Sequence, residues 1–164
     1  MKRSFIIFLF IACGILTGII LTRIFFTPYT IHSNSMLPTM KKGKYCIFMK
    51  IGKPKKGDIV LLEHPTKEST YLVRRVAAIE NDFIEIKEGQ ILINNKIFHP
   101  QWKINEKSTD TLPNYFSKRD NLLRQRIKRN NFFLLNDTLD LSYDSREFGQ
   151  VSKNKIKGIL VFSK

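Results

Sequence analysis

The chain has 164 residues, a length that suits one domain of ordinary size with an appended segment. Hydrophobic residues make up 43% of it, enough to bury a core. The formal charge of +14 indicates either binding to acidic surfaces such as lipid headgroups or a lysine-rich face exposed to solvent. Cys13 lies in an apolar run and Cys46 in a later segment, so we do not expect a disulfide between them, and no metal site can be built from the two.

An uncharged, strongly apolar run covers residues 4–21, close to the shortest length that spans a bilayer. Arg23 can snorkel and so lengthen the span. Lys2 and Arg3 precede the run, so the positive-inside rule places the N-terminus in the cytoplasm and the rest of the chain outside. We expect an uncleaved anchor; the alternatives are a cleaved signal peptide or a lipid attachment at Cys13.

Short strand-like segments follow the apolar run. We therefore expect a membrane anchor over residues 1–29 and a mainly β, antiparallel domain over residues 30–164. The segment "DFIEIKEGQILINNKIF" alternates in polarity and contains two turn signals, which predicts a hairpin meander. The other expected strands are "KYCIFMKI", "IVLLEH", "YLVRRVAAI", "NFFLL" and "IKGILVF".

Strand character is lost in a basic insertion near residues 101–130. Ser117 and Asp120 fit a capping box that opens a short basic helix, with Leu123 and Ile127 on one face. The simpler interpretation is a solvated surface insertion, and the alternative is a helix that docks on a membrane surface or a partner.

The segment "SNSMLPT" allows a nucleophile hypothesis. A serine hydroxyl needs a base, a fixed orientation and donors for the oxyanion. In this loop Pro38 limits flexibility, and the neighbouring serines offer donors. Taken alone, the same residues also fit an ordinary Ser/Thr/Pro turn.

Four blocks in order extend the pattern: "SNSMLPTM", "KKGDIVLL", "YLVRRVAAIENDFIEI" and "FFLLNDTLDLSYDSREFG". With them the chain resembles the signal peptidase I family, membrane-bound Ser/Lys proteases, and most closely the short members of conjugative transfer systems. The resemblance implies an antiparallel β fold, no metal or cofactor, and precursor proteins with N-terminal leader peptides as partners. It also implies an apolar surface that rests on the lipid bilayer, with Phe48 and Met49 as candidates unless they simply pack in the core.

The resemblance assigns roles where residues match. Ser35 falls on the nucleophile, and Ser33 on the hydroxyl that helps to form the oxyanion hole. In "SYDSR", Ser142 matches the hydroxyl that orients the base. The residues that match the supporting part of this signature are Asp144, Ser145 and Arg146.

The position of the catalytic lysine is occupied by Arg74, because the chain reads "VRRV" where "VKRV" is expected. An arginine pKa of about 12.5–13.8 would have to fall by roughly six units for free base to be present near neutrality, and burial rarely supplies more than about 3–5 units. His64 and His99 have suitable side chains, but their spacing does not direct them at Ser35. Arg74 could instead orient a water molecule or stabilise the oxyanion.

Two functions follow from this pattern. The first is a single-pass serine endopeptidase of the bacterial inner membrane that removes leader peptides from exported or conjugation-apparatus proteins, with its domain on the outer side. The second is a catalytically impaired scaffold that binds leader-like peptides or secretion-apparatus partners without cleaving them. A nucleic-acid partner is not expected, because no recognition motif accompanies the charge.

Overall fold

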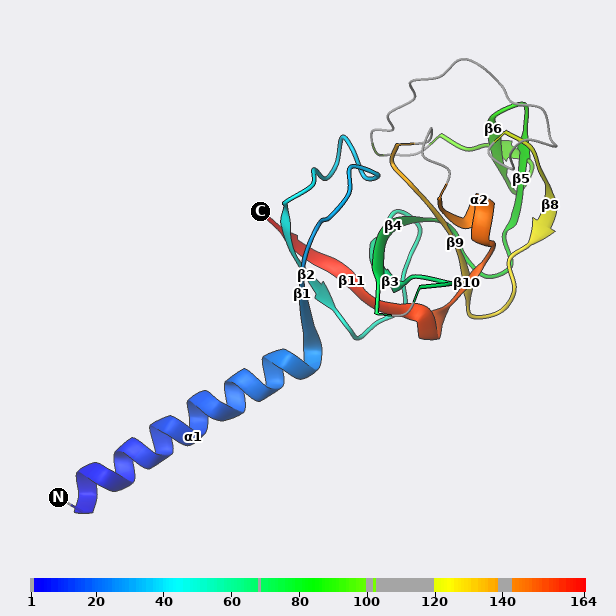
Figure 1. Cartoon of the computed structure of the whole chain (residues 1–164). Coiled ribbons are helices and arrows are strands. Elements are labelled where there is room, and N and C mark those ends of the chain that lie inside the picture. The colour runs from blue at the N-terminus through cyan, green and yellow to red at the C-terminus, as the bar shows by residue number, and fades with distance from the viewer. Residues whose placement is uncertain (1, 68, 100–101, 103–119, 139–142) are drawn as a thin grey trace.

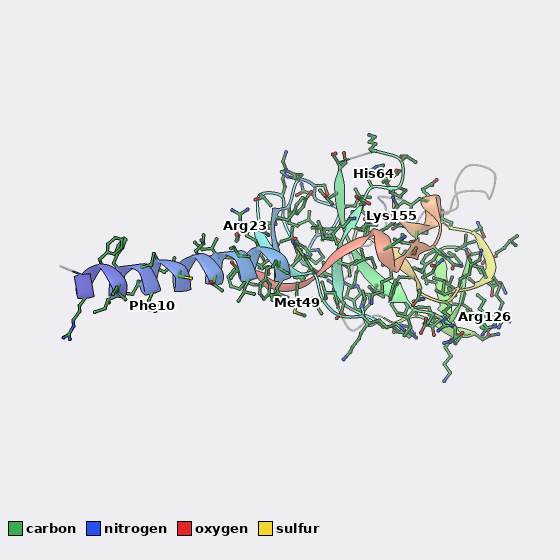
Figure 2. The ribbon with its side chains drawn as sticks, turned by 90° about the horizontal axis from the view of Figure 1, so that it is seen from below. Phe10, Arg23, Met49, His64, Arg126 and Lys155 are labelled. Atoms are coloured by element: carbon green, nitrogen blue, oxygen red, sulfur yellow. The ribbon has the colours of Figure 1, made fainter. Side chains whose placement is uncertain are left out.

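The protein is described by a computed structural model that covers residues 2–67, 69–99, 102, 120–138 and 143–164. One long helix, α1 (Lys2–Phe25), extends away from a β region that contains the other described elements (Figure 1). Large apolar side chains of α1 are exposed along its length (Figure 2). Residues Phe5–Phe25 are long and apolar enough to cross a membrane, which makes this helix a candidate span.

The described strands form two antiparallel sheets. In spatial order, the seven-stranded sheet contains β1 (Phe26–Thr30), β2 (Tyr45–Met49), β11 (Ile156–Ser163), β3 (Ile59–Glu63), β4 (Tyr71–Ala78), β9 (Asn131–Leu135) and β10 (Val151–Ser152). The four-stranded sheet contains β7 (Lys96–Ile97), β6 (Gln90–Ile93), β5 (Phe83–Lys87) and β8 (Leu122–Arg126). Two short helical segments, α2 (Ser145–Phe148) and η1 (Lys153–Lys155), precede β10 and β11. The expected mainly β fold behind a single N-terminal apolar helix is confirmed.

The β5–β6–β7 meander has the form that the sequence predicts. Ile84 and Ile86 point into the core at period two, while Phe83 and Lys87 are exposed. Glu88 and Gly89 both adopt positive φ, 48° and 77°, in the tight turn between β5 and β6. This local chemistry explains why the hairpin can be recognised without tertiary information.

The predicted basic helix around residues 120–127 is wrong. Residues Leu122–Arg126 form strand β8, which pairs with β5 at the far end of the molecule from α1; Figure 2 shows Arg126 there. Leu123 is 91% exposed whereas Ile127 is 1% exposed, so the two do not share an apolar face. Pairing with the backbone of β5 and burial of Ile127 override the helix signal. Ser117, the other half of the predicted capping box, lies outside the described residues.

The junction between α1 and the sheet contains no linker. α1 ends at Phe25, and β1, a strand that the sequence did not indicate, begins at the next residue and pairs with β2. Lys50 holds this junction, because its N–H donates to the Phe25 carbonyl at 2.8 Å and its Nζ donates to the Arg23 carbonyl at 2.7 Å.

Phe48 and Met49, the two residues proposed for a membrane-facing surface, differ in burial. Phe48 is completely buried in the core, in contact with the residues around the Ser35 loop, so the core-packing alternative holds for it. Met49 is half-buried and lies beside the junction of α1 with the β region (Figure 2).

Candidate active site

The loop that carries Ser35 runs between β1 and β2 and is fixed from both sides. Met36 and Met40 are buried in the core, so the short turn between them cannot lift off the sheet. On the other side, the Thr138 N–H donates to the Ser35 carbonyl at 3.1 Å, and the Thr138 hydroxyl donates to the Leu37 carbonyl at 3.2 Å. The side chain of Ser35 is thereby held at a constant place.

Ser35 Oγ has two hydrogen-bond partners among the described residues. It lies 2.9 Å from Ser33 Oγ, where either hydroxyl can donate, and it accepts a hydrogen bond from Arg74 Nη1 at 3.1 Å. The structure thus brings together the three residues that sequence analysis placed at the nucleophile, at the oxyanion donor and at the position of the base.

Arg74 projects from β4 into a buried position, with 4% of its surface exposed. Its Nη1 also donates to the Val73 carbonyl at 2.6 Å, and its Nε and Nη2 donate to the Tyr143 carbonyl at 3.1 and 2.7 Å. Burial lowers the pKa of Arg74 to about 10, while the nearby charge of Asp144 acts in the opposite direction. The guanidinium group is therefore rigidly held and partly desolvated.

The next residue on β4, Arg75, points to the opposite face of the strand and has a different environment. Its Nε donates to Asp137 Oδ1 at 2.7 Å, and its Nη1 donates to the Gly57 carbonyl at 2.9 Å. Asp137 also accepts a hydrogen bond from the Thr39 hydroxyl, so this ion pair ties the Ser35 loop to the segment after β9. Sequence analysis did not identify this pair as part of the site, because the two residues are 62 positions apart.

The turn 144–146 forms a second buried ion pair. Asp144 caps α2 and accepts hydrogen bonds from the Arg146 N–H, Nε and Nη2 at 3.0, 2.9 and 2.8 Å, and from the Asn136 N–H at 3.0 Å. Ser145 Oγ accepts a hydrogen bond from the Leu134 N–H at 2.9 Å. These three residues thus fasten the turn to β9. Ser142, predicted to orient the base, lies outside the described residues.

His64 does not aim at Ser35. Its Nδ1 accepts the N–H groups of Thr66 and Lys67 at 3.2 and 3.1 Å, and its ring stacks on Tyr143 with centroids 5.0 Å apart. Burial, together with the charges of Lys67 and Arg74, lowers the pKa of His64. These contacts place His64 against the ring of Tyr143, and among the described residues no hydrogen bond joins His64 to Ser35.

A pocket of about 170 Å³ opens at Ser35. Its wall is mostly apolar or aromatic, with hydroxyl and cationic groups at one end; the lining residues are Tyr29, Ile31, His32, Ser33, Ser35, Met36, Tyr71, Leu72, Val73 and Arg74. Tyr29 comes from β1, the strand missed by sequence analysis, and its hydroxyl donates to the Tyr71 carbonyl at 3.2 Å. The pocket can hold a small side chain next to the Ser35 hydroxyl. That hydroxyl is also in contact with the Ser33 hydroxyl and the Arg74 guanidinium.

Comparison with known proteins identifies the family. The model of the family described as "Signal peptidase, peptidase S26" matches residues 2–163. Signal peptidase IB of Staphylococcus aureus (strain Mu50) is 29% identical over 163 residues, which cover 93% of this chain and 84% of the relative. Thylakoidal processing peptidase 1, chloroplastic, of Arabidopsis thaliana is 26% identical over 149 residues, or 82% of this chain and 41% of that protein. The fold is similar to that in the crystal structure of a signal peptidase I from Enterococcus faecalis V583, with a TM-score of 0.50 and 22% identity over 68% of this chain and 99% of that one. The chain belongs to the signal peptidase family, peptidase S26.

Proposed function

We propose that the protein is a membrane-anchored serine endopeptidase that removes N-terminal leader peptides from exported or conjugation-apparatus proteins. The family is one of peptidases that cleave leader peptides. The observation that carries the proposal for this member is the hydrogen-bonded group of Ser33, Ser35 and Arg74 at one end of a pocket.

In the proposed mechanism Ser35 Oγ attacks the scissile carbonyl carbon of a peptide seated in the pocket. The developing oxyanion is stabilised by the Ser33 hydroxyl and the Ser35 N–H. The proton of Ser35 passes to a neutral Arg74 and then to the leaving amine, and water hydrolyses the acyl-enzyme. Ser142 orients the base in this scheme, and the buried turn 144–146 keeps its carbonyl partner in place.

Arg74 sets the rate of this reaction at neutral pH. With a pKa of about 10, roughly one molecule in a thousand carries a neutral Arg74 at pH 7. The expected enzyme is thus slow near neutrality and faster in alkali. This is the physical consequence of an arginine where the family carries lysine.

The membrane arrangement is part of the proposal. α1 would anchor the protein as a single-pass segment in the bacterial inner membrane, with Lys2 and Arg3 in the cytoplasm and the β domain on the outer side. Lipid bilayer, precursor proteins and the conjugation or secretion apparatus are the partners that this arrangement implies.

A second function is favoured by one observation: Arg74 Nη1, the nitrogen that faces Ser35 Oγ, also donates to the Val73 carbonyl at 2.6 Å, so both of its N–H groups are engaged. A guanidinium that donates to Ser35 Oγ cannot at the same time accept its proton. The protein would then be a scaffold that binds leader-like peptides without cutting them.

The two functions are separated by incubating the full chain in detergent with a synthetic leader-bearing peptide and identifying products by mass spectrometry. The protease predicts cleavage that is absent from Ser35→Ala, and labelling of Ser35 by a serine-directed acylating probe. Equal product from wild type and Ser35→Ala would rule out Ser35-dependent catalysis. Peptide binding without labelling or cleavage would support the scaffold. Mapping new N-termini of exported proteins in cells with and without the gene would then identify the substrate.

A further inference from the structure

Arg74, Arg75 and Arg146 are the buried arginines among the described residues, and only two of them have a carboxylate partner there. Arg75, 6% exposed, pairs with Asp137, and Arg146, 3% exposed, pairs with Asp144. Arg74 is equally buried at 4% exposure, and the part of the chain that the structure describes provides it with no ion pair.

The acceptors of Arg74 are all neutral oxygens. They are the carbonyls of Val73 and Tyr143 and the hydroxyl of Ser35. Asp144 is the nearby carboxylate that acts on Arg74 through space, but its two oxygens accept from Arg146 and from the Asn136 N–H. A buried cation surrounded by neutral acceptors attracts an anionic ligand, because pairing offsets the cost of desolvating its charge.

The pocket gives such an anion a place beside Arg74. An acidic group that enters at Ser35 meets the guanidinium and the hydroxyls of Ser33 and Ser35 together. The rest of the lining is mostly apolar or aromatic, as at Ile31 and Met36, with His32 as a second basic side chain. The anion that fits is therefore a carboxylate attached to a small apolar side chain, and not a free inorganic ion.

We propose that this pocket binds the C-terminal carboxylate of a leader-type peptide that ends in a small apolar residue, with Arg74 as its counter-ion. The natural ligand rests on the proposed function: hydrolysis adds the oxygen of water to the scissile carbonyl carbon, so that the released leader ends in a carboxylate at Ser35 while the mature protein receives the new amine. A neutral lysine would release this product, whereas a charged arginine retains it. The site itself requires only a charged Arg74 in the pocket, so its preference for a carboxylate can be measured whether or not the protein cleaves.

The test compares two ligands on the wild-type full chain in detergent at pH 8. One probe is an acetylated leucine-rich peptide that ends in Ala-Ser-Ala with a free carboxylate, and the other is the same peptide as its carboxamide. Calorimetric titration should show the acid binding about tenfold to a hundredfold more tightly, the range expected for charge-assisted hydrogen bonds. Neither probe extends beyond the scissile position, so no mature fragment can be released, and mass spectrometry of the amide after the titration checks that it is still intact.

Variants locate the effect. Arg74→Gln should reduce the ratio between acid and amide to about one, while Lys128→Gln, which removes an exposed charge on the loop after β8, should leave it unchanged. His32→Gln tests the other basic side chain of the lining and should reduce the ratio less than Arg74→Gln does. If Arg74→Gln fails to fold, as judged by circular dichroism, the comparison of acid and amide on wild type still decides.

Equal affinity of acid and amide for wild type would overturn the proposal, as would a preference that survives Arg74→Gln or disappears in His32→Gln. Sodium acetate should compete only weakly; competition as strong as that of the peptide acid would point to a site for small free carboxylates instead. A strong preference for the acid in a protein that cleaves nothing would support the carboxylate site and contradict the proposed protease function. Cleavage without a preference for the acid would support the protease function and contradict the carboxylate site.

Discussion

The main-chain carbonyl of Tyr143 accepts two hydrogen bonds from Arg74, from Nε at 3.1 Å and from Nη2 at 2.7 Å. This fork-shaped contact depends on the planar arrangement of guanidinium donors. It leaves Nη1 directed at Ser35 Oγ. The orientation of the cation beside the proposed nucleophile is therefore set by the backbone.

The cleavage rate should rise with pH. The proton acceptor in the proposed mechanism is neutral Arg74, whose pKa is lowered to about 10 by burial, so the active fraction grows about tenfold per pH unit below that value. Measured kcat/KM for a leader-bearing peptide should increase about a hundredfold from pH 7 to pH 9. A profile that is flat over this range, with the protein still folded by circular dichroism, would show that Arg74 is not the base.

Arg74→Lys should accelerate cleavage at pH 7. The pKa of lysine is near 10.4, and a lowering similar to that of Arg74 brings it to about 8, so the neutral fraction at pH 7 rises about a hundredfold. Single-turnover rates at pH 7 are the measurement, and the alkaline limb of the pH profile should shift by about two units to lower pH. Loss of activity in Arg74→Lys, despite retained folding, would contradict the proposed role of this position.

Asp144→Ala should strongly destabilise the domain. Asp144 is fully buried and accepts four hydrogen bonds, so its removal takes away the carboxylate that pairs with the buried Arg146, at a cost of about 3–5 kcal/mol in the free energy of unfolding. Urea unfolding followed by fluorescence measures this. The control is Lys53→Gln, which breaks an exposed ion pair with Glu80 and should shift the urea midpoint very little. Similar shifts for both variants would show that the 144–146 turn is not a fastening point.

Gly158→Ala should weaken the packing of β11 on β2. A Cβ at position 158 would lie 2.8 Å from the Cβ of Phe48 and 3.1 Å from the Met49 carbonyl oxygen, atoms that cannot rotate away. Overpacking of this kind costs about 1–3 kcal/mol, so the melting temperature should fall by several degrees. Gly14→Ala is the matched control, since a Cβ there meets nothing within 4 Å and alanine favours the helix. An unchanged melting temperature for Gly158→Ala would contradict the close approach.

Local signals explain which parts of the fold were predictable. The hairpin of β5 and β6 combines strict alternation with a positive-φ turn, and both are visible in the sequence. Strand β1 was not predicted because its sequence, "FTPYT", contains a proline and directly follows an apolar run. The proline is tolerated in this strand because β1 lies at the edge of its sheet. β8 was taken for a helix because the pairing that determines it comes from β5, about forty positions earlier in the chain.

The site shows the same division. Ser33 and Ser35 are two positions apart in one loop, so their contact is a local feature, whereas the approach of Arg74 was expected from the family resemblance alone. Tyr29 and the Arg75–Asp137 pair depend on strand order and on a contact across 62 positions, which no local pattern encodes. The predicted role of Ser142 stays a prediction.

The direct connection of α1 to β1 limits how far Ser35 can lie from the end of the helix. With α1 inserted in a bilayer, Ser35 is separated from the lipid surface by one strand of five residues, about 17 Å, and a short loop. The hydrogen bonds from Lys50 to the Arg23 and Phe25 carbonyls restrict movement of the β region relative to the helix end. Under the proposed function, a precursor still lodged in the same bilayer would have to present its processing point at a matching height, so the depth of the substrate in the membrane would be selected alongside its amino-acid sequence.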